Sequence, residues 1–333
     1  MTVDDYICFV KRGPSAIIIT EVVFIAFIGI SIINKKSQPA VLGSITKSPI
    51  HKEYLIFPEQ SPLKYFYELK PDSVQTEHPD WLPYEATYTF NADGLNERYD
   101  YPITKPADTF RIITLGDSFT FGHYVNTADN WTERLEDDLN ASCKASMKYE
   151  VINLGVYGYD MQYSLERYRL RGAKYQPDLV IWLLLGERMN ELMHPTIDSL
   201  ERTMTEEEKN YARKKGDYSP EWTAALQQMM QQYTPKQRLE QERAFMRSFD
   251  ALYKGPLLFM VPPAVGSDYK ARIKLHAAER PDTYFASQLP DLSLSGGLLP
   301  DGHPNTSGHA SYAHFLHTYL SHMKLVPCTP NVN

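Results

Sequence analysis

The sequence is poor in cysteine, has no excess of positive charge and contains no internal repeat. Its 333 residues include only Cys8, Cys143 and Cys328, which form no Cys-x-x-Cys pair. A zinc knuckle and a dense disulfide framework are therefore excluded, while an oxidising compartment would allow one Cys143–Cys328 bridge. Lys and Arg number 34 against 41 Asp and Glu, and this acidic balance argues against nucleic acid as a partner.

Long hydrophobic runs are scarce as well, and the one that stands out lies near the N-terminus. Residues 15–33 contain a single charged side chain, Glu21, among eight Ile, two Val and two Phe. Because a helix needs about 20 mostly apolar residues to cross a membrane, we expect a membrane anchor within residues 1–36. A cleaved signal peptide and a buried core helix are the rival interpretations. Two basic residues flank the run on each side, so the positive-inside rule gives no orientation.

The next stretch, 37–105, is rich in proline and tyrosine and shows weak periodicity. This composition predicts a linker followed by short accessory strands. Within it, residues 84–101 alternate Tyr and Thr around Asn91-Ala92-Asp93-Gly94. We expect a strand, a turn and a second extended piece, which would form a hairpin packed on the following domain.

The stretch 106–325 alternates apolar runs with amphipathic ones. Predicted strands lie at 111–115, 149–154, 179–185 and 257–261, and predicted helices at 130–139, after Asp160 and at 307–323. Strands separated by helices predict an α/β domain with a mainly parallel sheet in three layers, α/β/α. A charged, helix-like insertion at about 187–255 is interpreted as solvated helix faces or as a lid. Residues 326–333 form a tail.

The first candidate for chemistry is Gly116-Asp117-Ser118, which follows a predicted strand and precedes a helix. Ligands bind at the carboxyl ends of parallel strands. Ser118 would lie near a helix N-terminus, whose amides can stabilise an oxyanion. A structural turn or N-cap serine is the alternative for this motif alone.

The second candidate is Asp301-Gly302-His303, in the loop before the last helix. A hydroxyl nucleophile needs a base, and the base needs an orienting acceptor. His303 and Asp301 supply both groups from one loop. His314 and His317 share a face of the helix that follows, but no carboxylate or cysteine follows on that face, so we expect no metal site.

Three motifs occur in a fixed order: GDSFTFG at 116–122, NLGVYGYD at 153–160 and DGHPN at 301–305. Together they resemble the SGNH/GDSL hydrolase superfamily over about residues 109–323. The turn at 91–94 also resembles bacterial members that place a short strand pair before the catalytic domain. Such members are often tethered to membranes and act on acyl groups of cell-surface carbohydrates or lipids.

The resemblance implies the SGNH fold, no metal or organic cofactor, and a role for each matching residue. Ser118 matches the nucleophile, His303 the general base and Asp301 the acid that orients the base. The oxyanion donors are the backbone N–H groups of Ser118 and Gly155 and the side chain of Asn190.

Two departures from the family pattern accompany these matches. A single residue, Gly302, separates Asp301 from His303, where the family usually has two, and some acetyl-transferring relatives share the shorter spacing. The usual Gly-x-Asn-Asp is replaced by Gly186-Glu187-Arg188-Met189-Asn190. Arg188 is therefore the alternative to Asn190 as the third oxyanion donor, and Glu187 is expected to point away.

The sequence thus predicts an SGNH-type serine esterase that cleaves an acyl ester through an acyl-enzyme on Ser118. The expected substrates carry O-acetyl or similar groups on a carbohydrate or lipid. We expect a single-pass membrane protein whose catalytic domain lies outside the cytoplasm. An O-acetyltransferase of a surface polysaccharide would use the same residues. A non-catalytic carbohydrate-binding or scaffold subunit is the alternative from another class.

Overall fold

The structure is a computed structural model, and it describes residues 55–143, 147–203, 205 and 220–328. The predicted anchor at 15–33 lies outside the described residues. Among the residues that the structure describes, no helix is both long and apolar enough to span a membrane.

Five parallel strands form the central sheet, in the order β6-β5-β7-β8-β9. They are β5 (Thr109–Leu115), β6 (Lys148–Asn153), β7 (Leu179–Leu183), β8 (Leu257–Met260) and β9 (Thr283–Ala286). The register pairs Ile113 of β5 with Ile152 of β6 and with Val180 of β7. The predicted parallel sheet is confirmed, and β9 is an additional strand that the apolar pattern did not reveal.

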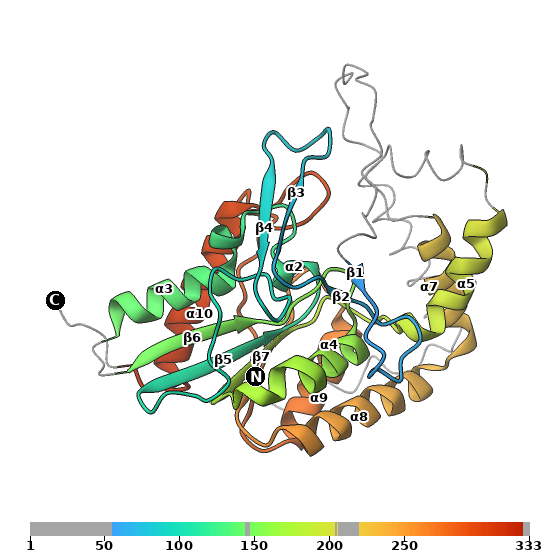
Figure 1. Cartoon of the computed structure of the whole chain (residues 1–333). Coiled ribbons are helices and arrows are strands. Elements are labelled where there is room, and N and C mark those ends of the chain that lie inside the picture. Colours follow the sequence, from blue (N-terminus) through green and yellow to red (C-terminus); the bar gives the residue numbers. More distant parts are fainter. Residues whose placement is uncertain (1–54, 144–146, 204, 206–219, 329–333) are drawn as a thin grey trace, which may run out of the picture. The chain divides into compact units, whose positions relative to one another are not determined.

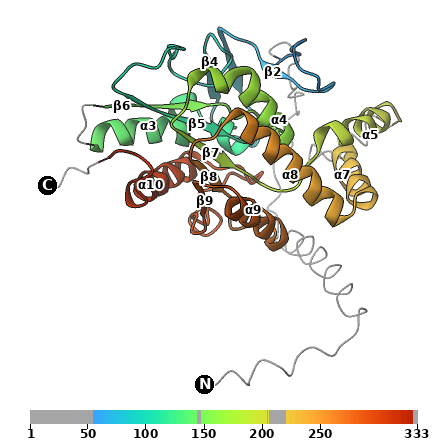
Figure 2. The ribbon, with the colours of Figure 1, turned by 90° about the horizontal axis from the view of Figure 1, so that it is seen from below.

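Helices cover both faces of this sheet (Figure 1). The helices of this domain are α3 (Trp131–Ser142), α4 (Met161–Arg167), α8 (Pro235–Leu252), α9 (Ser267–Glu279) and α10 (Thr306–His322). Neighbouring residues of β5 point to opposite faces: Ile112 packs with α3 and α10, whereas Ile113 packs with α4, α8 and α9. The three-layer α/β/α prediction is therefore confirmed, and α3 and α10 lie side by side in both views (Figure 2).

The segment predicted as a helical insertion divides into two parts. Helices α5 (Asn190–Thr203) and α7 (Pro220–Gln232) pack on each other around Met189, Met193 and Met229. Helix α8, in contrast, buries Phe245 and Phe249 against the sheet. It is therefore the crossover helix between β7 and β8, and the helices outside the layers are α5 and α7.

Within the described residues, four accessory strands precede the sheet in the sequence. They are β1 (Leu55–Ile56), β2 (Glu68–Leu69), β3 (Ser73–Glu77) and β4 (Ala86–Phe90). The predicted strand at β4 and the turn at 91–94 are present, but β4 pairs with the preceding β3. The piece after the turn pairs with the end of β4 through the antiparallel bridge Phe90–Asn96, and the Glu97 N–H donates to the Thr89 carbonyl oxygen. The expected hairpin across this turn is therefore present but short, and β3 is the strand that pairs with β4 along its length.

The accessory strands cover the loops that follow β5 and β6. Phe66, Tyr88 and Phe90 form one apolar cluster with Phe121 and Val156, and all five side chains are buried. Burial of large aromatic side chains is a major source of packing energy. Residues 55–105 are therefore part of the folded body.

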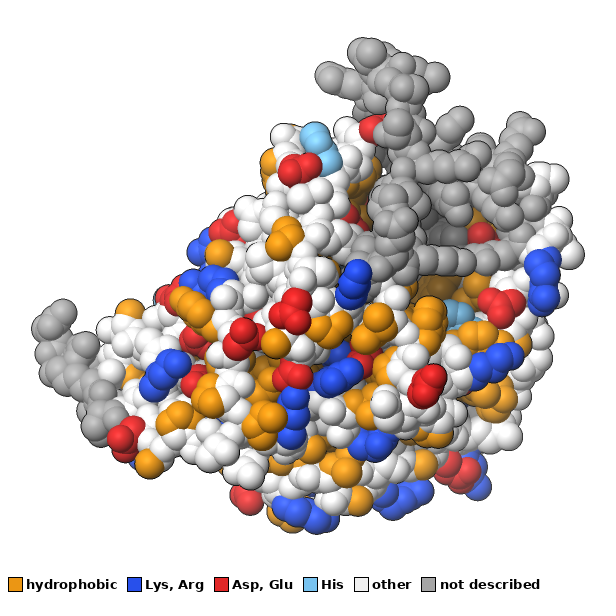
Figure 3. Space-filling model, in the orientation of Figure 1, with side chains coloured by type: hydrophobic (Ala, Val, Ile, Leu, Met, Phe, Trp, Pro, Cys, Tyr) orange, Lys and Arg blue, Asp and Glu red, His pale blue; other side chains and the backbone are white. Residues whose placement is uncertain are grey.

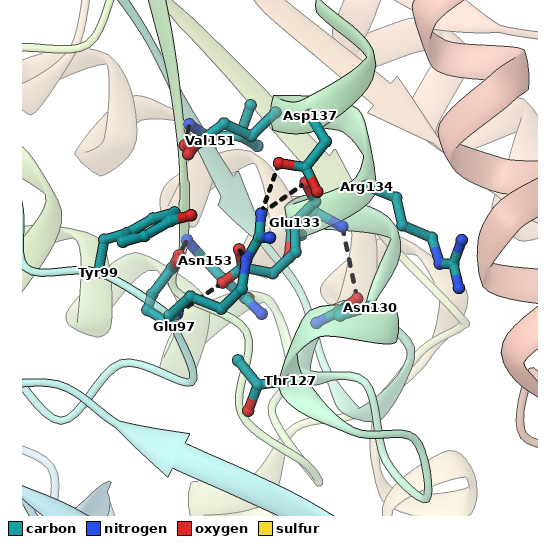
Figure 4. Close-up of polar contacts among 12 residues, drawn as sticks. Glu97, Tyr99, Thr127, Asn130, Glu133, Arg134, Asp137, Val151 and Asn153 are labelled. Carbon is teal, nitrogen blue, oxygen red and sulfur yellow. Dashed lines mark hydrogen bonds and ion pairs between the residues drawn. The ribbon is translucent and has the colours of Figure 1, made fainter. Parts of the chain in front are cut away.

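After the turn at 91–94, residues 95–101 form a strap that carries a carboxylate into the interior. Glu97 is 2% exposed and lies between β6 and α3 (Figure 4). It accepts the backbone N–H of Asn153, and the Tyr101 hydroxyl bridges it to Glu136 of α3. Burial, together with the charge of Glu133, raises the pKa of Glu97 well above its usual value. Burial also raises the pKa of Glu136, to about 7.

Candidate active site

The nucleophile lies in the turn that follows β5. Gly116 has φ +151°, and a Cβ there would lie 2.8 Å from the Leu183 carbonyl oxygen of the neighbouring strand, so glycine is required. Asp117 then caps the short helix α2 (Ser118–Phe121) by accepting the Phe119 N–H. Ser118 is the first residue of α2, where backbone N–H groups have no partner within the helix. The chain thus places a serine and a free helix N-terminus at the carboxyl edge of the sheet.

The predicted base lies in a tight loop before α10. Gly302 has φ +91°, and its N–H donates to the Leu299 carbonyl oxygen at 3.0 Å. This turn folds Asp301 back onto His303 although only one residue separates them. Asn305 then caps α10 by accepting the Gly308 N–H. The shortened Asp–His spacing is accommodated by a left-handed glycine.

The two loops meet in one hydrogen-bonded relay. His303 Nε2 lies 2.9 Å from Ser118 Oγ, and His303 Nδ1 lies 2.7 Å from Asp301 Oδ2. Burial opposes ionisation, but the hydrogen bonds from His303 hold the pKa of Asp301 below its usual value. Asp301 is therefore the charged acceptor that fixes the Nδ1–H tautomer and leaves Nε2 as the base. The predicted residues come together in the order that acyl transfer needs.

Two further contacts hold these loops in place. Asn130, the N-cap of α3, donates its Nδ2 to the carbonyl oxygens of Thr120 and Phe121 at the end of α2. The Trp131 N–H donates to Nδ1 of the buried His309 on α10. Burial lowers the pKa of His309 to about 3, so this ring is a neutral acceptor. The start of α3 thereby fixes both the nucleophile's helix and the helix that follows the base.

The N–H of Gly155, which was predicted as the second oxyanion donor, has an acceptor within the loop that follows β6. Its N–H donates to Asn153 Oδ1 at 2.9 Å, so it is not available to an oxyanion in this structure. A Cβ at position 155 would lie 2.6 Å from the Phe121 backbone nitrogen. Glycine at this position allows the loop after β6 to approach α2 closely.

The loop after β7 separates the three residues that were considered for the third donor. Asn190 is buried; its Nδ2 donates to the Gly158 carbonyl oxygen at 2.7 Å and its N–H to Asp160 Oδ2. Arg188 Nη1 lies 3.5 Å from Asp117 Oδ2, beside the nucleophile. Glu187 forms ion pairs with Arg238 of α8 and Arg272 of α9. Its carboxylate is thus engaged by the helix layer, as expected of a group that must not face an oxyanion.

A small cavity beside the nucleophile turn is lined by Gly116, Asp117, Asp160 and Arg188, among others. Burial raises the pKa of Asp117 and raises that of Asp160 to about 6, whereas Arg188 acts in the opposite direction on both. The guanidinium is therefore the cation that compensates two buried carboxyl groups.

Two residues near the base were not singled out from the sequence. His123, five residues after the nucleophile, packs its ring perpendicular to that of His303, with centroids 4.9 Å apart. Glu77 of β3 lies 2.8 Å from His123 Nε2. The GDSFTFG motif ends just before His123, and Glu77 lies in a segment without any motif, so no local pattern connects them.

One group of residues has the composition of a metal site. Ligand atoms of Cys143, His317 and Cys328 lie within 4.8 Å of one another. Cys143 and Cys328 are joined in a disulfide, which confirms the bridge that the sequence allowed. Because thiolates are the metal-binding form of cysteine, the bonded sulfurs are unsuited to hold an ion.

A scan against protein-family models gives no match, and a search among curated proteins gives none either. Solved structures are similar to the chain. One is a protein described as lipolytic and of the G-D-S-L family from Desulfitobacterium hafniense, with 16% identity over 62% of this chain and 98% of that chain, and a TM-score of 0.39. Another is an acetylxylan esterase from Geobacillus stearothermophilus, with 15% identity over 65% and 95% of the two chains and a TM-score of 0.39.

A third is a two-domain esterase active on acetylated mannans, 15% identical, with a TM-score of 0.42. The match covers 68% of this chain and 52% of that esterase. The first of these proteins is described as a member of the G-D-S-L family, and the other two are described as esterases. What each of them acts on is a property of that protein, and the chemistry of this chain rests on its own residues.

Proposed function

We propose that this chain is an SGNH-type serine esterase that cleaves an acyl ester through an acyl-enzyme on Ser118. The observation that carries the proposal is the unbroken relay from Ser118 Oγ through His303 to Asp301. The candidate substrates are O-acetyl or similar esters on a carbohydrate or lipid. Acetylated carbohydrates are also what two of the neighbouring esterases act on.

The residues act in sequence. Ser118 Oγ attacks the ester carbonyl while His303 Nε2 takes its proton, and Asp301 stabilises the imidazolium that forms. The tetrahedral oxyanion collapses, and His303 returns the proton to the departing alcohol oxygen. Water, deprotonated by the same nitrogen, then attacks the acyl-enzyme and releases the acid and free Ser118.

The oxyanion needs donors in addition to the Ser118 N–H at the start of α2. Because the Gly155 N–H is engaged, we assign the second donor to Gly158, the next glycine of the same loop. Its N–H has no hydrogen-bond partner within the described part of the chain. Its carbonyl oxygen is held by Asn190, and the second Nδ2 hydrogen of Asn190 is the proposed third donor.

We also propose that the catalytic domain lies outside the cytoplasm, tethered by the apolar run at 15–33. The Cys143–Cys328 disulfide supports this location, because disulfides persist in oxidising compartments and are rare in the cytosol.

The proposal is tested with Ser118→Ala and with a fluorophosphonate, which reacts only with an activated serine. We expect wild type to be labelled and to hydrolyse p-nitrophenyl acetate, and Ser118→Ala to do neither. Ser307→Ala, which changes an exposed serine at the start of α10, is the matched control and should behave as wild type. Equal hydrolysis by wild type and Ser118→Ala contradicts the assignment. Acyl transfer to an added glycan in preference to water would identify an acetyltransferase instead.

A further inference from the structure

A second carboxylate–imidazole pair lies against the catalytic base. His123 and His303 pack with ring centroids 4.9 Å apart and planes at 86°. Glu77 Oε2 lies 2.8 Å from His123 Nε2. This pair comes from β3 and from the loop after α2, whereas Asp301 and His303 come from the loop before α10. The accessory strands therefore contribute a charged group to the surroundings of the triad.

The position of Glu77 is fixed by further donors. Gln75 Nε2 donates to Oε1 at 3.2 Å, and the Tyr88 hydroxyl donates to Oε2 at 3.1 Å. Burial opposes ionisation, but the hydrogen bond from His123 is foremost among the contacts that hold the pKa of Glu77 below its usual value. Three donors around one carboxylate favour its charged form.

His123 is held as a neutral ring. A carboxylate only accepts hydrogen bonds, so Nε2 carries the proton that faces Glu77. The other nitrogen, Nδ1, is buried and has no hydrogen-bond partner within the described residues. A proton there would have no acceptor, and burial accordingly lowers the pKa of His123. The pair therefore carries one net negative charge.

The ring of His123 stacks with two tyrosine rings. The ring centroid of Tyr124 lies 3.7 Å from that of His123, and the centroid of Tyr157 lies 5.7 Å from it. Tyr124 has φ +67°, an unfavourable conformation for a residue other than glycine. Its N–H donates to the Tyr88 hydroxyl, and its carbonyl oxygen accepts the Tyr84 hydroxyl. Strained backbone of this kind persists where its surroundings fix it, and it is concentrated at functional sites.

We propose that Glu77 and His123 are positioning residues for the proposed esterase reaction. Their net negative charge stabilises the imidazolium that His303 becomes when it takes the Ser118 proton, in addition to the effect of Asp301. The titratable groups that face the two imidazoles are Glu77, Tyr88, Tyr124, Tyr157, Asp301, Asp117 and His309. Of these, only Glu77 supplies negative charge from the accessory strands.

The test is the pH profile of kcat/KM for p-nitrophenyl acetate, together with the rate of fluorophosphonate labelling against pH. In Glu77→Gln the acid limb should move to lower pH by about half a unit, since a missing negative charge makes the imidazolium less favourable. The plateau value of kcat/KM should fall about threefold, because half a pKa unit corresponds to a factor of about three. Glu77→Asp, which keeps the charge, should restore the wild-type limb.

The control is Glu85→Gln, which removes an exposed carboxylate from the same accessory segment and should leave the profile unchanged. A lower plateau in Glu77→Gln with an unmoved acid limb overturns the proposal, because a purely structural role has that signature. An acid limb that moves to higher pH also overturns it.

The inference rests on the proposed function, and different results would contradict each of the two. Absence of Ser118-dependent hydrolysis in wild type removes the function, whereas an active wild type with an unshifted Glu77→Gln removes only this inference.

Discussion

Asp117, the residue before the nucleophile, is buried, and Arg188 is the cation that approaches it. A buried carboxylate is costly unless it is paired and hydrogen-bonded. Arg188 therefore has a compensating task that keeps its guanidinium at Asp117. Asn190, in contrast, carries no charge and has one Nδ2 hydrogen not used by Gly158. This difference favours Asn190 over Arg188 as the third oxyanion donor.

The prediction at this scale concerns Asn190→Ala. It should lower kcat by about 100- to 1,000-fold with little change in KM, because the contact is made mainly in the transition state. Steady-state kinetics with p-nitrophenyl acetate measure both constants.

Arg188→Ala is the comparison variant. It should lower the melting temperature, because it removes the cation beside the buried Asp117. It should lower kcat much less than Asn190→Ala does. Glu187→Ala should also lower the melting temperature, since Arg238 loses its ion pair with Glu187 and Arg272 keeps only Glu242. A silent Asn190→Ala beside a crippled Arg188→Ala would instead make the guanidinium the donor.

At the scale of elements, the strap 95–101 joins the accessory strands to β6 and α3 through buried carboxyl groups (Figure 4). Glu97 and Glu136 have raised pKa values in the folded protein, so folding favours their protonated forms. Their contribution to stability is complete below the unfolded value near 4.5. It is lost as the pH rises through the folded values, which for Glu136 is about 7.

Glu97→Gln should therefore raise the melting temperature at pH 8, by a few degrees, and much less at pH 5. The amide keeps an acceptor for the Asn153 N–H and adds a donor toward Glu133, without adding charge. Thermal unfolding at both pH values is the measurement. Asp138→Asn, on the exposed face of α3, is the control and should show no such pH dependence. An equal effect of Glu97→Gln at pH 5 and pH 8 would contradict the raised pKa of Glu97 in the folded protein.

The sequence predicts the elements whose pattern is local. Parallel strands buried on both faces read as apolar runs, which is why β5, β6, β7 and β8 were located. Asp160 and Asn305 cap α4 and α10 through bonds to nearby residues. β9 was missed because Thr283, Tyr284 and Phe285 are only half-buried at the sheet's edge. The pairing of β4 with β3 was not predicted because β3 is a polar segment, Ser73–Glu77, without an apolar run.

The residues of the candidate site show the same difference between local and distant signals. Ser118, His303 and Asp301 were found because each lies in a short motif at a strand or helix end. Glu77 and His123 were not, because 46 residues separate them and no motif includes both. The free or engaged state of the Gly155 N–H depends on the Asn153 side-chain rotamer, which sequence does not determine.

At the scale of the whole molecule, the surface seen in Figure 3 intersperses acidic and basic side chains without a large field of one sign. The accessory strands belong to the folded body, since β3 and β4 contribute Glu77 and Tyr88 to the surroundings of the triad. The α/β layers and these strands are therefore expected to fold as one unit.

Two truncations test this expectation. Removal of residues 1–36 should give a soluble, folded protein with wild-type labelling by fluorophosphonate. Removal of residues 1–105 should abolish labelling and cooperative unfolding, because Glu97 and the aromatic cluster over α2 are lost with the accessory strands. Wild-type labelling by the shorter protein would show that the accessory strands are dispensable. Aggregation of the 37–333 protein, with a full chain that is soluble without detergent, would identify residues 15–33 as a core helix.

The Cys143–Cys328 disulfide has a consequence for the encounter of nucleophile and base. Along the backbone, Ser118 and His303 are 185 residues apart. Each cysteine lies 25 residues beyond one of them: Cys143 directly follows α3, and Cys328 lies in the segment after α10. In the oxidised chain the shortest covalent path is therefore about 50 residues. Loop-closure statistics make the effective concentration of the imidazole around the hydroxyl about sevenfold higher in the unfolded oxidised chain than in the reduced one.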